Sequence, residues 1–136
     1  MKSYVLTTLI IVSLFVPAAQ ASDDGQTQPR LTKGTLTGFN TSTDIIGTTI
    51  GSGNVKGVHC KFIAEDDASI KIYVNGGSAQ TLFLETEDYP DDLSGNVFSG
   101  WIPLNVRFTS SIRVQLTRPS GASGSIVTCQ VSWGLD

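Results

Sequence analysis

The sequence predicts one all-β domain, a single antiparallel β-sandwich of the jelly-roll-like or immunoglobulin-like kind, with one disulfide and a signal peptide in front of it. Three observations lead to this fold. Apolar and polar residues alternate in several short runs, and clusters of glycine, asparagine and serine separate those runs. No stretch after Lys33 repeats its apolar residues at helical spacing. Roughly seven or eight short strands in about a hundred residues are typical of two packed antiparallel sheets.

The N-terminal segment has the three-part layout of an export leader. Met1-Lys2 is a charged start, Tyr4–Val16 is nearly all apolar, and Pro17–Ala21 ends in an Ala-x-Ala pattern. We therefore expect residues 1–21 to be a signal peptide that is cleaved after Ala21. An uncleaved membrane anchor is the alternative, but the apolar stretch is shorter than the roughly 20 residues that cross a bilayer. The expected location is secreted, periplasmic or on an extracellular surface, with no stable membrane insertion after cleavage.

The rest of the chain divides into a lead-in and a domain. Residues 22–33 are polar and aperiodic, as expected of a flexible segment, and residues 34–136 hold the predicted sandwich. The 136-residue chain has a net charge of −3 at pH 7, and its basic residues form no run. Such a chain does not suit a phosphate backbone, so we expect no nucleic-acid binding.

The alternating runs indicate which side chains face the core. Residues two apart lie on the same face of a strand, so each run predicts one buried face and one wet face. Weaker strands are expected at Thr35–Phe39 and Ile45–Ile50. The predicted buried residues are Val58, Cys60 and Phe62; Ile70, Ile72 and Val74; Ile102, Leu104, Val106 and Phe108; Ile112, Val114 and Leu116; and Val127, Cys129, Val131 and Trp133.

A hairpin with a defined register is predicted around Asn75–Gly77. If these residues form a three-residue loop with a glycine in the left-handed region, the apolar residues of Ile70–Val74 share a face with Leu82 and Leu84. A two-residue loop would turn both leucines outward. Further along the chain, Pro103 lacks the N–H group that a central strand would use, so the run that contains it is predicted to be an edge strand.

Cys60 and Cys129 are predicted to form a structural disulfide. Each lies at an inward position of its run, and they are the only two cysteines of a chain that is expected to be exported. The lack of a Cys-x-x-Cys motif and the single histidine argue against a redox or zinc role. Closing about 70 residues would stabilise the fold by roughly 4 kcal/mol through the entropy of the unfolded chain.

No catalytic set of residues is apparent in the sequence, and we expect a protein that is not an enzyme. His59, the only histidine, falls on the outer face of its run and has no second nitrogen or sulfur ligand with which to hold zinc. No Gly-x-Ser-x-Gly motif marks a nucleophile. A secreted hydrolase is therefore the least favoured interpretation.

An acidic loop between two predicted strands has two interpretations. Glu85, Glu87, Asp88, Asp91 and Asp92 crowd this loop, and clustered carboxylates can hold Ca²⁺, which takes roughly six to eight oxygen ligands. The Asp-x-Asp-x-Asp-Gly pattern of an EF-hand is absent. We favour a solvated acidic loop over a calcium site, and expect no cofactor apart from that calcium.

Three aromatic residues are candidates for a ligand surface. Tyr73 and Phe83 are expected as diagonal neighbours on the outer face of the predicted hairpin, and Trp101 lies in a later run. If all three point outward on one sheet, they form an apolar platform for sugar rings or for a protein partner. The other interpretation, which we favour, has them covering the sheet beneath the acidic loop.

The order of several short motifs resembles a known structural class. The motifs are Gly57-Val58-His59-Cys60, Ala68–Tyr73, Trp101–Leu104, Phe108–Val114 and Ser125–Trp133. Together they resemble the small β-sandwich modules of bacteriophage virion proteins, such as tail, spike and head-decoration parts. The resemblance covers residues 53–133 and rests on strand order and loop placement. The leader and the cysteines depart from it, because parts of tailed phages assemble in the cytosol. A host-secreted relative, or a virus with exported subunits, would account for that departure.

Two functions follow from these expectations. The first is a non-catalytic structural or adhesion module that docks on a protein assembly at a cell or virion surface, and an oligomer is compatible with this function. The second is a carbohydrate-binding module that uses the aromatic surface, with or without calcium at the acidic loop. The expected partner is accordingly a protein assembly or a surface glycan.

Overall fold

The computed structural model describes residues 29–63 and 67–136, and eight β-strands make up most of them. The predicted signal peptide, residues 1–21, and most of the predicted lead-in lie outside the described residues. Within the described part of the chain, no helix is long and apolar enough to cross a membrane. The elements are β1 (Arg30–Thr37), β2 (Ser42–Ile50), β3 (Gly53–Ile63), β4 (Ala68–Val74), β5 (Ala79–Leu84), the short 3-10 turn η5 (Thr86–Asp88), β6 (Asn96–Phe108), β7 (Ser111–Thr117) and β8 (Ile126–Leu135).

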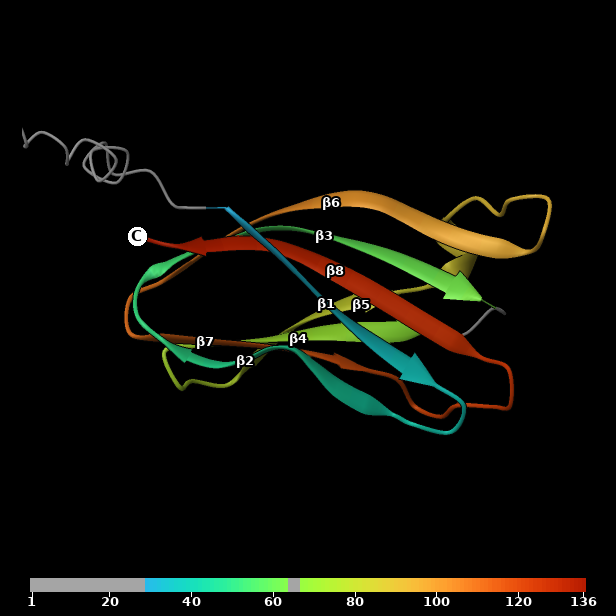
Figure 1. Cartoon of the computed structure of the whole chain (residues 1–136), viewed down its shortest axis with the longest axis horizontal. Helices are drawn as coiled ribbons and strands as arrows, with labels where there is room; N and C mark the ends of the chain where they lie inside the picture. The colour runs from blue at the N-terminus through green and yellow to red at the C-terminus, as the bar shows by residue number, and fades with distance from the viewer. Residues whose placement is uncertain (1–28, 64–66) are drawn as a thin grey trace, which may run out of the picture.

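The strands form two four-stranded antiparallel sheets that pack face to face (Figure 1). Sheet A has the order β1-β8-β3-β6, and sheet B has the order β2-β7-β4-β5. Early strands pair with late ones: β1 with β8, β2 with β7, β3 with β6, and β4 with β5. The chain is thus one long hairpin whose strand pairs alternate between the sheets, which is the jelly-roll arrangement. This order confirms the predicted antiparallel sandwich and favours its jelly-roll form over the immunoglobulin form.

The core lies between the two sheets and consists of the alternating apolar residues. Most of the inward positions predicted from the sequence are buried, among them Phe62, Ile70 and Leu116. Period-two patterning therefore assigns the buried face correctly along β3, β4, β7 and β8.

Cys60 and Cys129 form the predicted disulfide, and both residues are fully buried. They lie directly opposite each other in the β3–β8 ladder, so the bridge joins neighbouring strands of sheet A rather than the two sheets. The two cysteines are 69 residues apart in the sequence and belong to opposite halves of the long hairpin. The bridge therefore links the two halves covalently within sheet A.

The tip of the long hairpin is the turn at Asn75–Gly77, and its register is the predicted one. Ile70 lies opposite Leu82, so the apolar residues of β4 and β5 share the inner face. Asn75 and Gly76 have φ angles of 54° and 74°, so the left-handed region is occupied by an asparagine as well as by a glycine. Asparagine is one of the few residues with a side chain that tolerate this conformation.

β6 is an edge strand of sheet A, as Pro103 predicts. It is 13 residues long, whereas β5, the edge strand of sheet B, has 6 residues. Ile102, Leu104 and Val106 lie on this edge strand and are half-buried, whereas the sequence predicts that they are buried. Phe108, at the end of β6, is fully buried as predicted.

β1 begins at Arg30, inside the segment 22–33 that the sequence predicts to be a flexible lead-in. It ends at Thr37, before the end of the predicted strand Thr35–Phe39, and Gly38 follows with a φ angle of 55°. The ladder with β8 covers the whole of β1. Backbone pairing with β8 thus orders residues that have no apolar alternation of their own, which sequence periodicity does not reveal.

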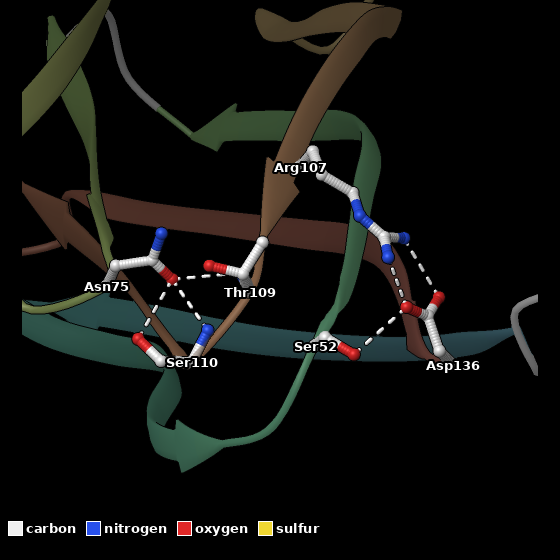
Figure 2. Close-up of polar contacts among 6 residues, drawn as sticks. All are labelled: Ser52, Asn75, Arg107, Thr109, Ser110 and Asp136. Atoms are coloured by element: carbon white, nitrogen blue, oxygen red, sulfur yellow. Dashed lines mark hydrogen bonds and ion pairs between the residues drawn. The ribbon is translucent and has the colours of Figure 1, made fainter.

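The hairpin tip is tied to the β6–β7 turn by the side chain of Asn75 (Figure 2). Its Oδ1 atom accepts the backbone N–H of Thr109 at 2.9 Å, the N–H of Ser110 at 2.8 Å, and the Ser110 hydroxyl at 3.2 Å. The N–H of Asn75 in turn donates to the carbonyl of Ser111 at 2.8 Å. One amide side chain therefore joins two turns that are far apart in the sequence.

The C-terminal end of β8 is held at the same end of the sandwich, as Figure 2 also shows. The Arg107 guanidinium donates two hydrogen bonds to the Asp136 carboxylate, and the Ser52 hydroxyl donates a third at 3.0 Å. The hydrogen bonds to Asp136 raise the pKa of Arg107 above its ordinary value.

A buried arginine holds the opposite end of the β7 strand. Arg118 is 4% exposed and follows the last residue of β7. Its guanidinium donates to the carbonyl of Gly38, to the carbonyl of Asn40 at 2.8 Å and to the hydroxyl of Ser125 at 2.7 Å. These contacts join the β1–β2 turn to the loop before β8, and sequence patterning did not predict this buried cation.

Candidate functional site

The outer face of sheet A carries a cluster of aromatic residues on β3 and β6. His59 lies opposite Trp101 in the β3–β6 ladder and, as predicted, points away from the core. The centroid of the His59 ring is 5.7 Å from that of Trp101 and 6.5 Å from that of Phe98. The Lys61 ammonium lies 5.6 Å from the Phe98 ring centroid. We call Phe98, His59 and Trp101 the aromatic row, and Trp101 is 53% exposed at its end.

Phe98 and Trp101 share one face because of a β-bulge. Residues three apart in a regular strand point to opposite faces. In β6, Ser99 and Gly100 together face the single residue Cys60 of β3, which restores both aromatic side chains to the outer face. For this reason Phe98 was not among the aromatic residues predicted from the sequence, although a glycine inside the run was a signal of a bulge.

Next to Trp101, the outer face of sheet A is hollowed. The hollow has a volume of about 320 Å³, at the lower end of the range for small-ligand sites, which is roughly 300–1,000 Å³. All four strands of the sheet contribute to it: Leu31 from β1, Ser132 from β8, Lys56 and Gly57 from β3, and Trp101 and Pro103 from β6.

Two local features of β3 shape this hollow. A Cβ atom on Gly57 would lie 3.1 Å from the carbonyl oxygen of Ile102, which is a tight contact, so glycine allows the backbone of β6 to lie close to β3 beside Trp101. Lys56 is the extra residue in a second bulge, where β3 shifts its register against β8. Bulges redirect side chains, and this one places an exposed lysine at the edge of the hollow.

Charge is unevenly distributed between sheet A and the rest of the chain. The four strands of sheet A contain no aspartate and no glutamate, although the full chain has a net charge of −3. Sheet B is mixed, and there Asp44 pairs with Arg113 at 3.1 Å. The basic residues of the sheet A strands are Arg30, Lys33, Lys56, Lys61 and Arg107.

The three aromatic residues singled out from the sequence do not form one platform. Tyr73 and Phe83 lie on strands of sheet B, whereas Trp101 lies on the outer face of sheet A. The two on sheet B are not diagonal neighbours either, because Phe83 is opposite Ser69 and Tyr73 is opposite Ala79. The separation has a simple cause. The parity of a residue, meaning its odd or even position along a strand, shows on which face of the sheet it lies, but not to which sheet the strand belongs.

The environments of these three residues also differ. The Tyr73 ring is covered by the Arg113 guanidinium, which lies 5.3 Å from its centroid, and its hydroxyl donates to Gln115 at 3.4 Å. Phe83 is 71% exposed and Trp101 is 53% exposed, so the acidic loop does not cover them. Of the three, only Trp101 lies beside a hollow with other aromatic rings next to it.

The acidic loop uses a carboxylate for its own closure. Oδ1 of Asp92 accepts the backbone N–H of Ser94 at 2.8 Å and of Asn96 at 2.9 Å, and the N–H of Asp92 donates to the Asn96 carbonyl. The N–H of Asn96 is the main cause that lowers the pKa of Asp92 below its ordinary value. Burial, helped by the charges of Asp88 and Glu85, raises the pKa of the neighbouring Tyr89.

No metal centre forms from the predicted calcium ligands. In residues 29–63 and 67–136, no three aspartate, glutamate, histidine or cysteine side chains converge in a way that could hold an ion. Glu85, Glu87, Asp88 and Asp91 are all exposed side chains of the loop around η5.

Comparison with known proteins adds no relative. No protein-family model matches the chain, and no curated protein is significantly similar to it in sequence.

Proposed function

We propose that this protein is an exported, non-catalytic adhesion module that binds a ligand at a cell or virion surface through the outer face of sheet A. The observation that carries the proposal is the hollow beside Trp101, which draws side chains from all four strands of that sheet. A half-exposed tryptophan next to a concave surface is a common anchor for recognition, because its ring offers a large contact area at a small entropy cost.

Two further features support this choice of face. The disulfide joins β3 to β8, the two central strands of sheet A, so two of the strands that line the hollow are covalently linked. Preorganised surfaces lose less conformational entropy on binding. The fold adds support by analogy alone, because jelly rolls occur both as viral capsid domains and as lectin domains.

The test is a binding screen of the purified protein against arrays of cell-surface glycans and of cell-envelope proteins. Trp101→Ala is the site variant. Phe83→Ala is the matched control, because Phe83 is an exposed aromatic residue on strand β5 of the other sheet. We expect the wild-type protein and the control to bind the same targets, and Trp101→Ala to lose them. Bound targets recovered after incubation should be chemically unchanged.

Three outcomes would count against the proposal. They are no bound target in either array, equal binding by Trp101→Ala and the wild-type protein, and a target that the protein cleaves or modifies.

A further inference from the structure

The strands of sheet A are rich in basic residues, although the chain as a whole is acidic. These four strands hold five basic residues and no acidic ones, as described above. Three of the five have other contacts: Arg107 pairs with Asp136, Arg30 lies over the ring of the inward-facing Trp133, and Lys61 lies over Phe98. The charge of Lys61 also helps to lower the pKa of Asp92 in the acidic loop. The remaining two cations are the ones that a ligand would meet.

Lys33 and Lys56 are those two lysines. Both are exposed, and neither has an ion-pair partner within residues 29–63 and 67–136. Lys56 lines the hollow. Lys33 lies opposite Gln130, Gln130 lies opposite His59, and His59 lies opposite Trp101, so one row of side chains crosses the sheet from a cation to an indole ring. A ligand lying along this row meets positive charge at one end and an aromatic ring at the other.

The chemistry around the hollow suits a sugar better than a protein partner. Polar side chains lie next to apolar ones on this face: Leu31 is opposite Ser132, and further along β1 the hydroxyl of Thr35 is hydrogen-bonded to that of Thr128. The hollow combines the apolar side chains of Leu31, Trp101 and Ile102 with the ammonium group of Lys56 and the hydroxyl of Ser132. A sugar ring needs one aromatic face for its C–H groups and nearby hydroxyl or amide groups for its own hydroxyls.

We propose that the outer face of sheet A binds an acidic polysaccharide, with a sugar ring stacked on Trp101 and carboxylates held by Lys33 and Lys56. This inference rests on the proposed function, since it names the ligand class of the same face. It assigns binding roles to two lysines and to Gln130, which lies between Lys33 and His59 in the row. The aromatic ring supplies stacking and the lysines supply long-range attraction, so binding requires both the ring and the charge of the ligand.

The experiment measures affinity for four acidic polymers: polygalacturonate, alginate, hyaluronate and polysialic acid. Two probes separate the contributions. Methyl-esterified polygalacturonate has the same rings without the charge, and polyglutamate has the charge without the rings. We expect binding of at least one acidic polymer, weakened about tenfold or more by methyl esterification or by replacement with polyglutamate. Raising the salt concentration from about 50 mM to about 500 mM should weaken it further, because exposed charges are screened.

Variants with matched controls locate the site on the protein. Trp101→Ala should weaken binding about tenfold, and Lys33→Gln and Lys56→Gln should each weaken it roughly two- to fivefold. Phe83→Ala and Lys71→Gln make the same changes on sheet B and should leave the affinity within about twofold of the wild-type value. Circular dichroism and thermal unfolding of every variant verify that the fold is retained.

The results separate the ligand class from the proposed function. The ligand class is overturned if no acidic polymer binds, if polyglutamate binds as well as the sugars, or if the esterified polymer binds equally well. In each of these cases, the proposed function stands if Trp101→Ala still abolishes binding in the array screen. If Trp101→Ala matches the wild-type protein in both experiments, both proposals fail.

Discussion

Removal of the Cys60–Cys129 bridge is the perturbation whose magnitude follows most directly from the structure. The bridge joins residues 69 positions apart, and the chain-entropy relation assigns about 15 cal/mol/K to closing a loop of this length. At 298 K this corresponds to about 4 kcal/mol, which is a large part of the roughly 5–15 kcal/mol that stabilises a typical domain. For a domain of this size, such a loss lowers Tm by roughly 15–20 °C.

Two forms of the perturbation separate the cross-link from the packing. Reduction of the wild-type protein keeps both sulfur atoms in the core and removes only the covalent bond. The double variant Cys60→Ala/Cys129→Ala also removes the two sulfurs, which are fully buried, so it should lose about 1–2 kcal/mol more.

The assay is urea-induced unfolding followed by tryptophan fluorescence, with oxidised and reduced protein measured side by side. The free energy of unfolding should fall by about 4 kcal/mol on reduction. The reasoning is refuted if the two forms differ by less than about 1 kcal/mol. It is also refuted if thiol titration of untreated, denatured protein finds two free thiols.

Substitutions at three further positions are tested by thermal and urea unfolding and, for Asp92, by NMR titration. Asn75→Gly should cost about 2 kcal/mol of unfolding free energy, because the hydrogen bonds to the β6–β7 turn are lost while glycine still favours the left-handed backbone. Asn75→Ala should cost about 1 kcal/mol more, because alanine does not favour a positive φ angle. Equal losses in the two variants would show that the φ angle of residue 75 does not contribute. Arg118→Met should cost about 3 kcal/mol, because the carbonyl groups of the β1–β2 turn and the buried hydroxyl of Ser125 lose their charged donor, and a loss below about 1 kcal/mol would contradict this. The hydrogen bond from the N–H of Asn96 lowers the pKa of Asp92 in the folded state. The contribution of the ionised Asp92 to stability is therefore complete above the ordinary pKa of aspartate, about 4, and is lost as the pH falls through the pKa of the folded state. NMR titration of Asp92 should give a pKa below the ordinary value of an aspartate, and Asp92→Asn should remove this part of the acid dependence.

Local pattern was sufficient to predict several details of the fold. The register of the β4–β5 hairpin follows from the requirement that Ile70 and Leu82 share a face, and the structure confirms it. The edge position of β6 follows from the missing donor of Pro103. Inward parity of Cys60 and Cys129 was enough to predict their bridge. Each of these inferences depends only on neighbours along the chain or on one required pairing.

The candidate site could not be predicted in the same way, because it depends on the order of strands in each sheet. Parity placed Tyr73, Phe83 and Trp101 on outer faces but could not tell that β4 and β5 belong to one sheet and β6 to the other. The bulge at Gly100 reverses parity within β6, which hid Phe98 from the sequence analysis.

The charge of the candidate site was hidden for a related reason. In the sequence, the lysines of the outer face are scattered: Lys33 and Lys56 lie on strands that are far apart in the chain. Only the order β1-β8-β3-β6 brings them together on one sheet without an acidic residue among its strands. Net charge is a property of the whole chain and does not reveal a local difference between two sheets.

A ¹⁵N NMR titration shows most directly whether the outer face of sheet A is the binding surface. The titrant is the acidic oligosaccharide that the protein binds most tightly. We expect the largest shifts at the Trp101 indole N–H and at the amides of Lys56, His59 and Gln130. Shifts concentrated around Phe83 on sheet B, or the absence of any shift at saturating ligand, would contradict this expectation.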